Sequence, residues 1–109
     1  MNRYLVEMQL APQAFAAFVK NPSDRQQANA PVNAALGGKL VEYYFGVGSN
    51  TVYCIMEFPD QVSLEAVTMA ILASGSVLAS KCVGILTASE AVAAMEMAGG
   101  AGYRAPASK

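Results

Sequence analysis

Two runs of apolar and aromatic residues, separated by a glycine-rich turn, form the centre of the sequence. Lys39 to Phe45 (KLVEYYF) and Thr51 to Phe58 (TVYCIMEF) are rich in the β-branched and aromatic residues that favour strands. The segment between them contains Gly46, Gly48 and Asn50, which tolerate the backbone conformations of a tight turn. The pattern therefore predicts a β-hairpin whose loop is longer than two residues.

The two strands of this hairpin are apolar on both faces. Simple alternation places Leu40, Glu42 and Tyr44 on one face of the first strand, and Val41, Tyr43 and Phe45 on the other. A strand that is apolar on both sides is normally covered on both sides. We therefore expect helices on one face of the sheet and a second copy of the chain on the other.

The segments before the hairpin predict one strand and two helices. Tyr4 to Leu10 alternates like a strand, and Pro12 suits the first turn of a helix. A second helix is expected to begin with Asn21 as its cap and to run to Leu36, with Pro31 kinking or breaking it.

The segments after the hairpin predict a helix, a strand and a last helix. Asp60 is the expected cap of a helix that ends at Gly75. A strand follows within Val77 to Leu86, mainly from Ser80 onward. Thr87 or Ser89 is expected to cap a final helix that continues to about Ala98.

The resulting order is β-α-β-β-α-β with an added C-terminal helix. This is the α+β, ferredoxin-like arrangement, for which right-handed crossovers give an antiparallel sheet of strand order 4-1-3-2. Residues 1–98 are expected to form a single domain, and residues 99–109, rich in glycine and small residues, a flexible tail.

Composition narrows the possible functions. In 109 residues, 54% are hydrophobic, 14% are charged and the net charge is −1. Without a basic patch, nucleic-acid binding is not expected. No run is long enough to span a membrane, and Glu7 and Gln9 interrupt the apolar stretch that a signal peptide needs, so we expect no targeting segment. Two cysteines and no histidine fit a reduced, cytoplasmic protein. The chain has no histidine, the commonest general base and metal ligand, and we expect neither a metal nor a cofactor.

The hairpin and the segments that flank it make the sequence similar to a known family. The segment LGGKLVEYYFGVGSNTVYCIMEFPD, the Ala-rich helix, ASG, a strand and LTASE resemble the GYD domain family, a group of small bacterial proteins. LGGKL at 36–40 and EFPD at 57–60 carry the resemblance best. The resemblance implies a dimeric α/β barrel built from ferredoxin-like subunits, and no general activity.

The family's name-giving turn is altered in this chain. Family members usually have a glycine, an acidic or variable residue and then Tyr-Asp at this turn, whereas here Gly48 is followed by Ser49, Asn50 and Thr51. Whatever the Tyr and Asp do in relatives is therefore absent or changed. Barrels of related families include cofactor-free monooxygenases, isomerases and polyketide cyclases, which is an analogy of fold alone.

Several strand residues are candidates for a binding or catalytic site. Glu7, Tyr43, Tyr44, Tyr53 and Met56 are candidates for a pocket that takes a flat apolar ligand. Packing in the core or in an interface is the alternative role for the aromatic residues.

Catalysis would rest on a smaller group of these residues. Glu42, Tyr44 and Tyr53 are the candidates, in a cleft between the sheet and the helices. For the carboxylates Glu7, Glu42 and Glu57, the alternative is exposure at a strand end or pairing with Arg3, Lys39 or Lys81.

The two cysteines are expected to be buried thiols rather than a disulfide. Cys54 and Cys82 lie on strands that the first strand separates in the predicted sheet. Two strand spacings are about 9–10 Å, which is too far for a disulfide.

Three functions remain open from the sequence. The first is an oligomeric module that binds an apolar or aromatic small molecule. The second is a cofactor-independent enzyme for an aromatic or polyketide-like substrate. The third is a structural assembly subunit with the C-terminal helix as an arm. A closed pocket on the order of a few hundred Å³, with converging Tyr and Glu side chains, would support the enzyme, whereas a filled core would support the structural subunit.

Overall fold

The computed structural model describes residues 1–107 and contains a four-stranded sheet with four helices. The elements in chain order are β1 (Asn2–Leu10), α1 (Pro12–Lys20), α2 (Arg25–Ala35), β2 (Lys39–Phe45), β3 (Thr51–Phe58), α3 (Gln61–Ala73), β4 (Val77–Ile85) and α4 (Ala88–Gly99). The predicted β-α-β-β-α-β order and the C-terminal helix are confirmed.

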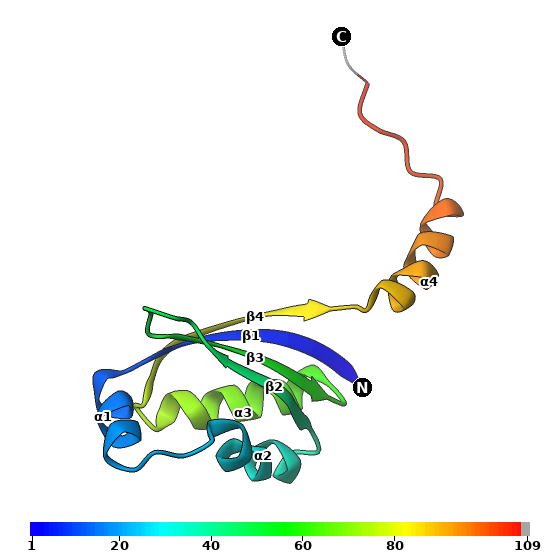
Figure 1. The fold of residues 1–109 in the computed structure, drawn as a ribbon. Helices are drawn as coiled ribbons and strands as arrows, with labels where there is room; N and C mark the ends of the chain where they lie inside the picture. The colour runs from blue at the N-terminus through cyan, green and yellow to red at the C-terminus, as the bar shows by residue number, and fades with distance from the viewer. Residues whose placement is uncertain (108–109) are drawn as a thin grey trace.

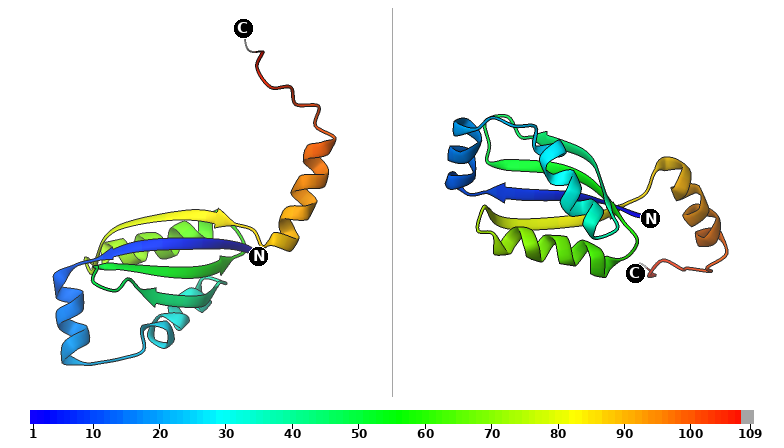
Figure 2. Two further views of the ribbon diagram at one scale, coloured as in Figure 1. Left: turned by 45° about the horizontal axis from the view of Figure 1, so that its top comes forward. Right: turned by 90° about the horizontal axis from the view of Figure 1, so that it is seen from below.

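The sheet is antiparallel throughout, with β1 and β3 at its centre. Its order is β2-β3-β1-β4, which is the predicted order read from the other edge. Helices α1, α2 and α3 lie on one face, and within residues 1–107 no helix covers the opposite face (Figures 1 and 2). We call this second side the open face of the sheet.

The hydrophobic core lies between the sheet and the three helices. It is formed by alternate residues of the two central strands together with residues of α3. The buried residues of β1 and β3 are Tyr4, Val6, Met8, Leu10, Val52, Cys54, Met56 and Phe58. Because β1 and β3 pair in register, with Val6 opposite Cys54, the two apolar rows lie side by side on the helix-covered face.

A shift of register in β2 corrects the predicted facing of that strand. The shift falls between Leu40 and Glu42, so that Leu40 lies opposite Met56 while Tyr43 lies opposite Cys54. Both partners belong to the buried row of β3, so Leu40 and Tyr43 share the helix-covered face. Simple alternation predicts Leu40 and Tyr43 on opposite faces. The register shift inserts one extra residue into β2, as in a β-bulge, and this places both residues on the same face.

Helices α3 and α4 begin at capping residues as expected, but the capping residue of the second helix differs from the predicted one. The Asp60 side chain accepts a hydrogen bond from the Ser63 amide (2.8 Å), which lowers the pKa of Asp60. The second helix does not begin after Asn21, however. Asp24 caps it, because its side chain accepts from the amides of the second and third helical residues. The helix continues through Pro31 without a break.

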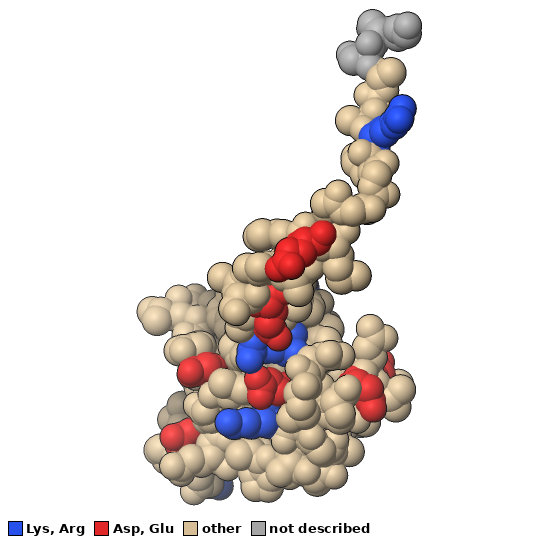
Figure 3. Space-filling model, turned by 90° about the vertical axis from the view of Figure 1, so that its right-hand side faces the viewer, with Lys and Arg blue, Asp and Glu red and all other residues tan. Residues whose placement is uncertain are grey.

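Helix α4 stands apart from the core. Thr87 and Glu90 form its capping box, in which each side chain accepts from the other residue's backbone amide. No residue of α4 is buried. Arg3 pairs with Glu90 of α4 (3.3 Å) and with Glu57 of β3 (2.9 Å), at the end of the molecule where charges of both signs gather (Figure 3).

The chain after α4 has no regular secondary structure as far as residue 107. The flexibility expected for residues 99–109 stays a prediction, and its last two residues lie outside the described part of the chain.

Candidate functional site

A cavity of about 760 Å³ lies between the helix-covered face of the sheet and helices α1, α2 and α3. Its apolar wall comes from the strands and from the inner sides of α1 and α3, and includes Met8, Leu10, Phe18, Leu40, Met56 and Val67. Exposed residues of all three helices, among them Ala17 and Ala70, also line it, so it opens to solvent. The volume is in the range of small-molecule sites.

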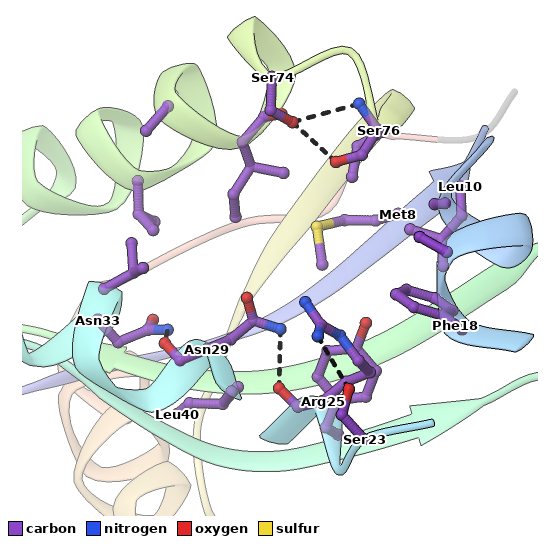
Figure 4. A pocket seen from close by; sticks show the side chains of 18 of the residues that line it. Met8, Leu10, Phe18, Ser23, Arg25, Asn29, Asn33, Leu40, Ser74 and Ser76 are labelled. Atoms are coloured by element: carbon purple, nitrogen blue, oxygen red, sulfur yellow. Dashed lines mark hydrogen bonds between the residues drawn. The ribbon is translucent and has the colours of Figure 1, made fainter. Parts of the chain in front are cut away.

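One side of this cavity is polar and belongs to α2. Arg25, Asn29 and Asn33 follow one another at intervals of four residues, so they lie on the same side of the helix and line the cavity (Figure 4). Asn29 Nδ2 donates to the Arg25 carbonyl (2.8 Å), and Asn33 Nδ2 donates to the Asn29 carbonyl (3.1 Å). The row is therefore held by hydrogen bonds to the backbone of its own helix.

Arg25 brings a positive charge to the cavity. Its guanidinium lies over the Phe18 ring, 4.9 Å from the ring centroid, and Nη1 donates to Ser23 Oγ (3.1 Å). Nε is shielded from solvent and has no protein acceptor. No Asp or Glu lines the cavity among the described residues, and the ion pairs found in that part of the chain do not include Arg25.

Tyr43 lines the cavity as a neutral hydroxyl group. Burial, with a smaller contribution from Cys54, raises the pKa of Tyr43 to about 12, although the charge of Arg25 acts in the opposite direction. The phenol therefore stays protonated at neutral pH and can donate a hydrogen bond.

Asn33 is the most buried polar residue of the site. The residue is 2% exposed. Because its Nδ2 is fixed by the bond to Asn29, the orientation of the amide is defined, and Oδ1 is left without a protein donor. Buried polar atoms are nearly always paired, so this end of the cavity has unused hydrogen-bonding capacity.

Two of the predicted pocket residues line this cavity and three do not. Tyr43 and Met56 line it, whereas Glu7, Tyr44 and Tyr53 belong to the open face. The difference follows the alternation of the strands, because successive side chains of a strand point to opposite faces.

The candidate catalytic residues meet one another on the open face, not in the expected cleft between sheet and helices. Tyr44 lies opposite Tyr53, and the Tyr44 hydroxyl donates to Glu42 (3.1 Å), which raises the pKa of Tyr44. All three side chains are exposed. Their catalytic role stays a prediction.

Two of the three strand carboxylates have basic partners that the alternative interpretation named, whereas Glu42 accepts from the Tyr44 hydroxyl instead. Glu57 pairs with Arg3, and Glu7 lies 3.6 Å from Lys81. Glu7 also lines a small hollow of about 240 Å³ on the open face. The Lys81 side chain is exposed, and a pair of that kind contributes little to stability.

The cysteines differ from the prediction in one respect. Cys54 is buried, and burial raises the pKa of its thiol to about 12. Cys82, expected to be buried, is exposed because β4 is an edge strand. Both thiols are free, and β1 separates their strands as predicted.

The polar row on α2 was not among the sequence-predicted site residues. Its signal is present in the sequence, as three polar residues, Arg25, Asn29 and Asn33, at four-residue spacing. Such a row is also what the solvent side of a helix shows, and only the packing of α2 places it against the cavity.

Two features of residues 1–107 bear on the class of protein. No helix among them is long and apolar enough to cross a membrane. Within the same residues, histidine, cysteine, aspartate and glutamate side chains do not gather in groups of three that could hold a metal ion.

The chain forms a ferredoxin-like α+β domain with a mostly apolar cavity, open to solvent, between its sheet and its helices. The model of the GYD domain family matches residues 4–98, and the chain belongs to this family. Comparison with curated proteins and with solved structures finds no match.

Proposed function

We propose that this GYD domain binds an apolar or aromatic small molecule in the cavity beneath its sheet. The observation that carries the proposal is the cavity itself. A hollow of about 760 Å³, open to solvent on one side, lies between the sheet and α1, α2 and α3, and this volume is large enough for a small molecule. An apolar wall with a few polar groups at one side is the usual composition of a ligand site.

Native mass spectrometry of protein purified from its own host tests this proposal directly. Extra mass of a few hundred daltons that is lost on denaturation is the expected result. Methionine methyl NMR then locates the ligand, because Met8 and Met56 line the cavity whereas Met69 is exposed elsewhere.

A substitution at the opening provides the control. Ala17 lines the cavity and is exposed, so Ala17→Trp should block the opening without overpacking the core. Ala16 is also exposed on α1 but does not line the cavity, and Ala16→Trp should leave binding unchanged. Equal binding by both variants, or no ligand in any preparation and no response to added aromatic compounds, would refute the proposal.

We propose in addition that two copies associate through the open face. Val83 is 53% exposed there, and Leu5 and Ile55 are only partly covered. Leu5 lies opposite both Ile55 and Val83 in the sheet, so the three side chains form one continuous apolar surface. Burying such a surface is favourable by about 25 cal/mol per Å².

Light scattering on two variants tests the association. Val83→Arg should shift the protein to a monomer, because it places a charge in the proposed contact. Val19→Arg is the matched control, since Val19 is exposed on α1 at the other side of the molecule. A wild-type protein that is monomeric at micromolar concentration would contradict this proposal and leave the ligand proposal standing.

A further inference from the structure

The cavity combines an apolar wall with one partly buried cation, and this combination points to a particular class of ligand. Arg25 lies at the first turn of α2, with its guanidinium against the Phe18 ring. A cation over an aromatic face is held in place, so its orientation does not have to be fixed when a ligand arrives.

The charge of Arg25 is not neutralised within the cavity. The nearest acidic residue in sequence, Asp24, uses its carboxylate to accept from the amides of Gln26 and Gln27 as the helix cap. Within the described residues, the Arg25 side chain donates one hydrogen bond, to the neutral Ser23 hydroxyl. A guanidinium in such a setting gains most from an anionic partner, because charge-assisted hydrogen bonds are about twice as strong as neutral ones.

The neighbouring polar groups favour the same sign of ligand charge. Tyr43 presents a protonated phenol that can donate, and no carboxylate among the described lining residues would repel an anion. The rest of the wall offers thioether, aliphatic and aromatic surface, as Met8, Leu10, Phe18 and Leu40 show in Figure 4. The ligand therefore needs an anionic end and an apolar body.

We infer that the cavity selects organic acids, with the carboxylate held by Arg25 beside the Tyr43 hydroxyl and the apolar body lying against the sheet. This inference rests on the proposed small-molecule function and adds the charge of the ligand to it. Arg25 acts as a binding residue, and no covalent step is involved.

The test compares acids with their uncharged esters. Naphthalene carboxylic acid and decanoic acid, each with its methyl ester, are titrated into full-length protein while the methionine methyl signals are followed by NMR. The acids should shift Met8 and Met56 and bind more tightly than their esters. Arg25→Gln should weaken acid binding about tenfold to hundredfold and change ester binding little, since one charge-assisted contact is lost.

Two further variants separate the local contact from other effects. Lys20→Gln removes an exposed charge of α1 that does not line the cavity, and it should leave acid binding unchanged. Arg25→Lys retains the charge without the planar fork and should recover part of the affinity. Thermal unfolding of each variant verifies that it is folded.

The possible outcomes distinguish the two levels of the proposal. If esters and acids bind equally well, or if Arg25→Gln and Lys20→Gln weaken acids to the same extent, the inference about charge is wrong while the binding function stands. If neither acids nor esters move Met8 and Met56, both fail.

Discussion

Replacing Asn33 by leucine should stabilise the protein, which is unusual for a substitution at a buried position. Asn33 is 2% exposed and its Oδ1 has no protein donor. Leucine removes that unpaired acceptor. Because Asn33 lines the cavity, the slightly larger side chain has room to fit.

The magnitude follows from three contributions. Leaving a buried acceptor unpaired costs about 1–3 kcal/mol, which the substitution recovers. The lost bond from Nδ2 to the Asn29 carbonyl costs about 0.5–1.5 kcal/mol. That carbonyl is inside α2, where the backbone amide four residues later also reaches it, so it is not orphaned. Leucine is a better helix former than asparagine by a few tenths of a kcal/mol. The free energy of unfolding should therefore rise by about 1–2 kcal/mol.

Urea unfolding followed by circular dichroism measures this change. Gln27→Leu is the control, because Gln27 is exposed on the same helix and its substitution should stay within about 0.5 kcal/mol. A thermal midpoint higher by about 5 °C would accompany the expected gain. If Asn33→Leu instead lowers the free energy of unfolding by 1 kcal/mol or more, the Oδ1 atom is satisfied in solution and the reasoning is refuted.

Four other predictions concern the space beside the backbone of Gly38, the chemistry of the two thiols and the C-terminal helix. Gly38→Ala should lower the free energy of unfolding in urea by about 1–3 kcal/mol, because a Cβ at this position would lie 2.6 Å from the Glu57 carbonyl oxygen. Gly84→Ala is the control and should be close to neutral, since a Cβ there would meet no other atom. A thiol reagent at pH 8 should label Cys82 and spare Cys54, whose thiol is buried and has a pKa raised to about 12; labelling of both in the folded protein would contradict this. For the same reason the stability that the neutral Cys54 thiol provides should be complete below its ordinary pKa of 9.0 and be lost as the pH rises toward 12, which alkaline unfolding would show. Thr87→Ala removes the N-cap of α4 and should speed hydrogen exchange of the α4 amides. The free energy of global unfolding should stay nearly unchanged, since no residue of that helix is buried. A large decrease in that free energy would show that α4 packs on the core.

The differences between expectation and structure have local physical causes. Tyr43 was assigned to the face opposite Leu40 because a strand was assumed to alternate without interruption, and the register shift after Leu40 places both residues on the same face. The second helix was expected to start after Asn21, but Asp24 offers the better cap because its carboxylate accepts from two amides. Cys82 was expected to be buried like Cys54, and its place on an edge strand exposes it.

The sequence by itself determined the elements, their order and the sheet topology. Strand periodicity, turn glycines and capping residues act over a few positions, so β2 and β3 were predicted with the bounds that the structure shows. The short connections and the handedness of crossovers then leave few ways to arrange four strands. The match to the GYD domain family over residues 4–98 agrees with that result.

Only the tertiary structure decided which polar residues form a site. Arg25, Asn29 and Asn33 become cavity residues because α2 turns this side toward the sheet, and Tyr44 and Tyr53 become open-face residues because their strands turn them the other way. The spacing of these residues along the sequence does not by itself determine which of them face the cavity. A cavity arises from the distances between packed elements, and these depend on side chains that are far apart in the sequence.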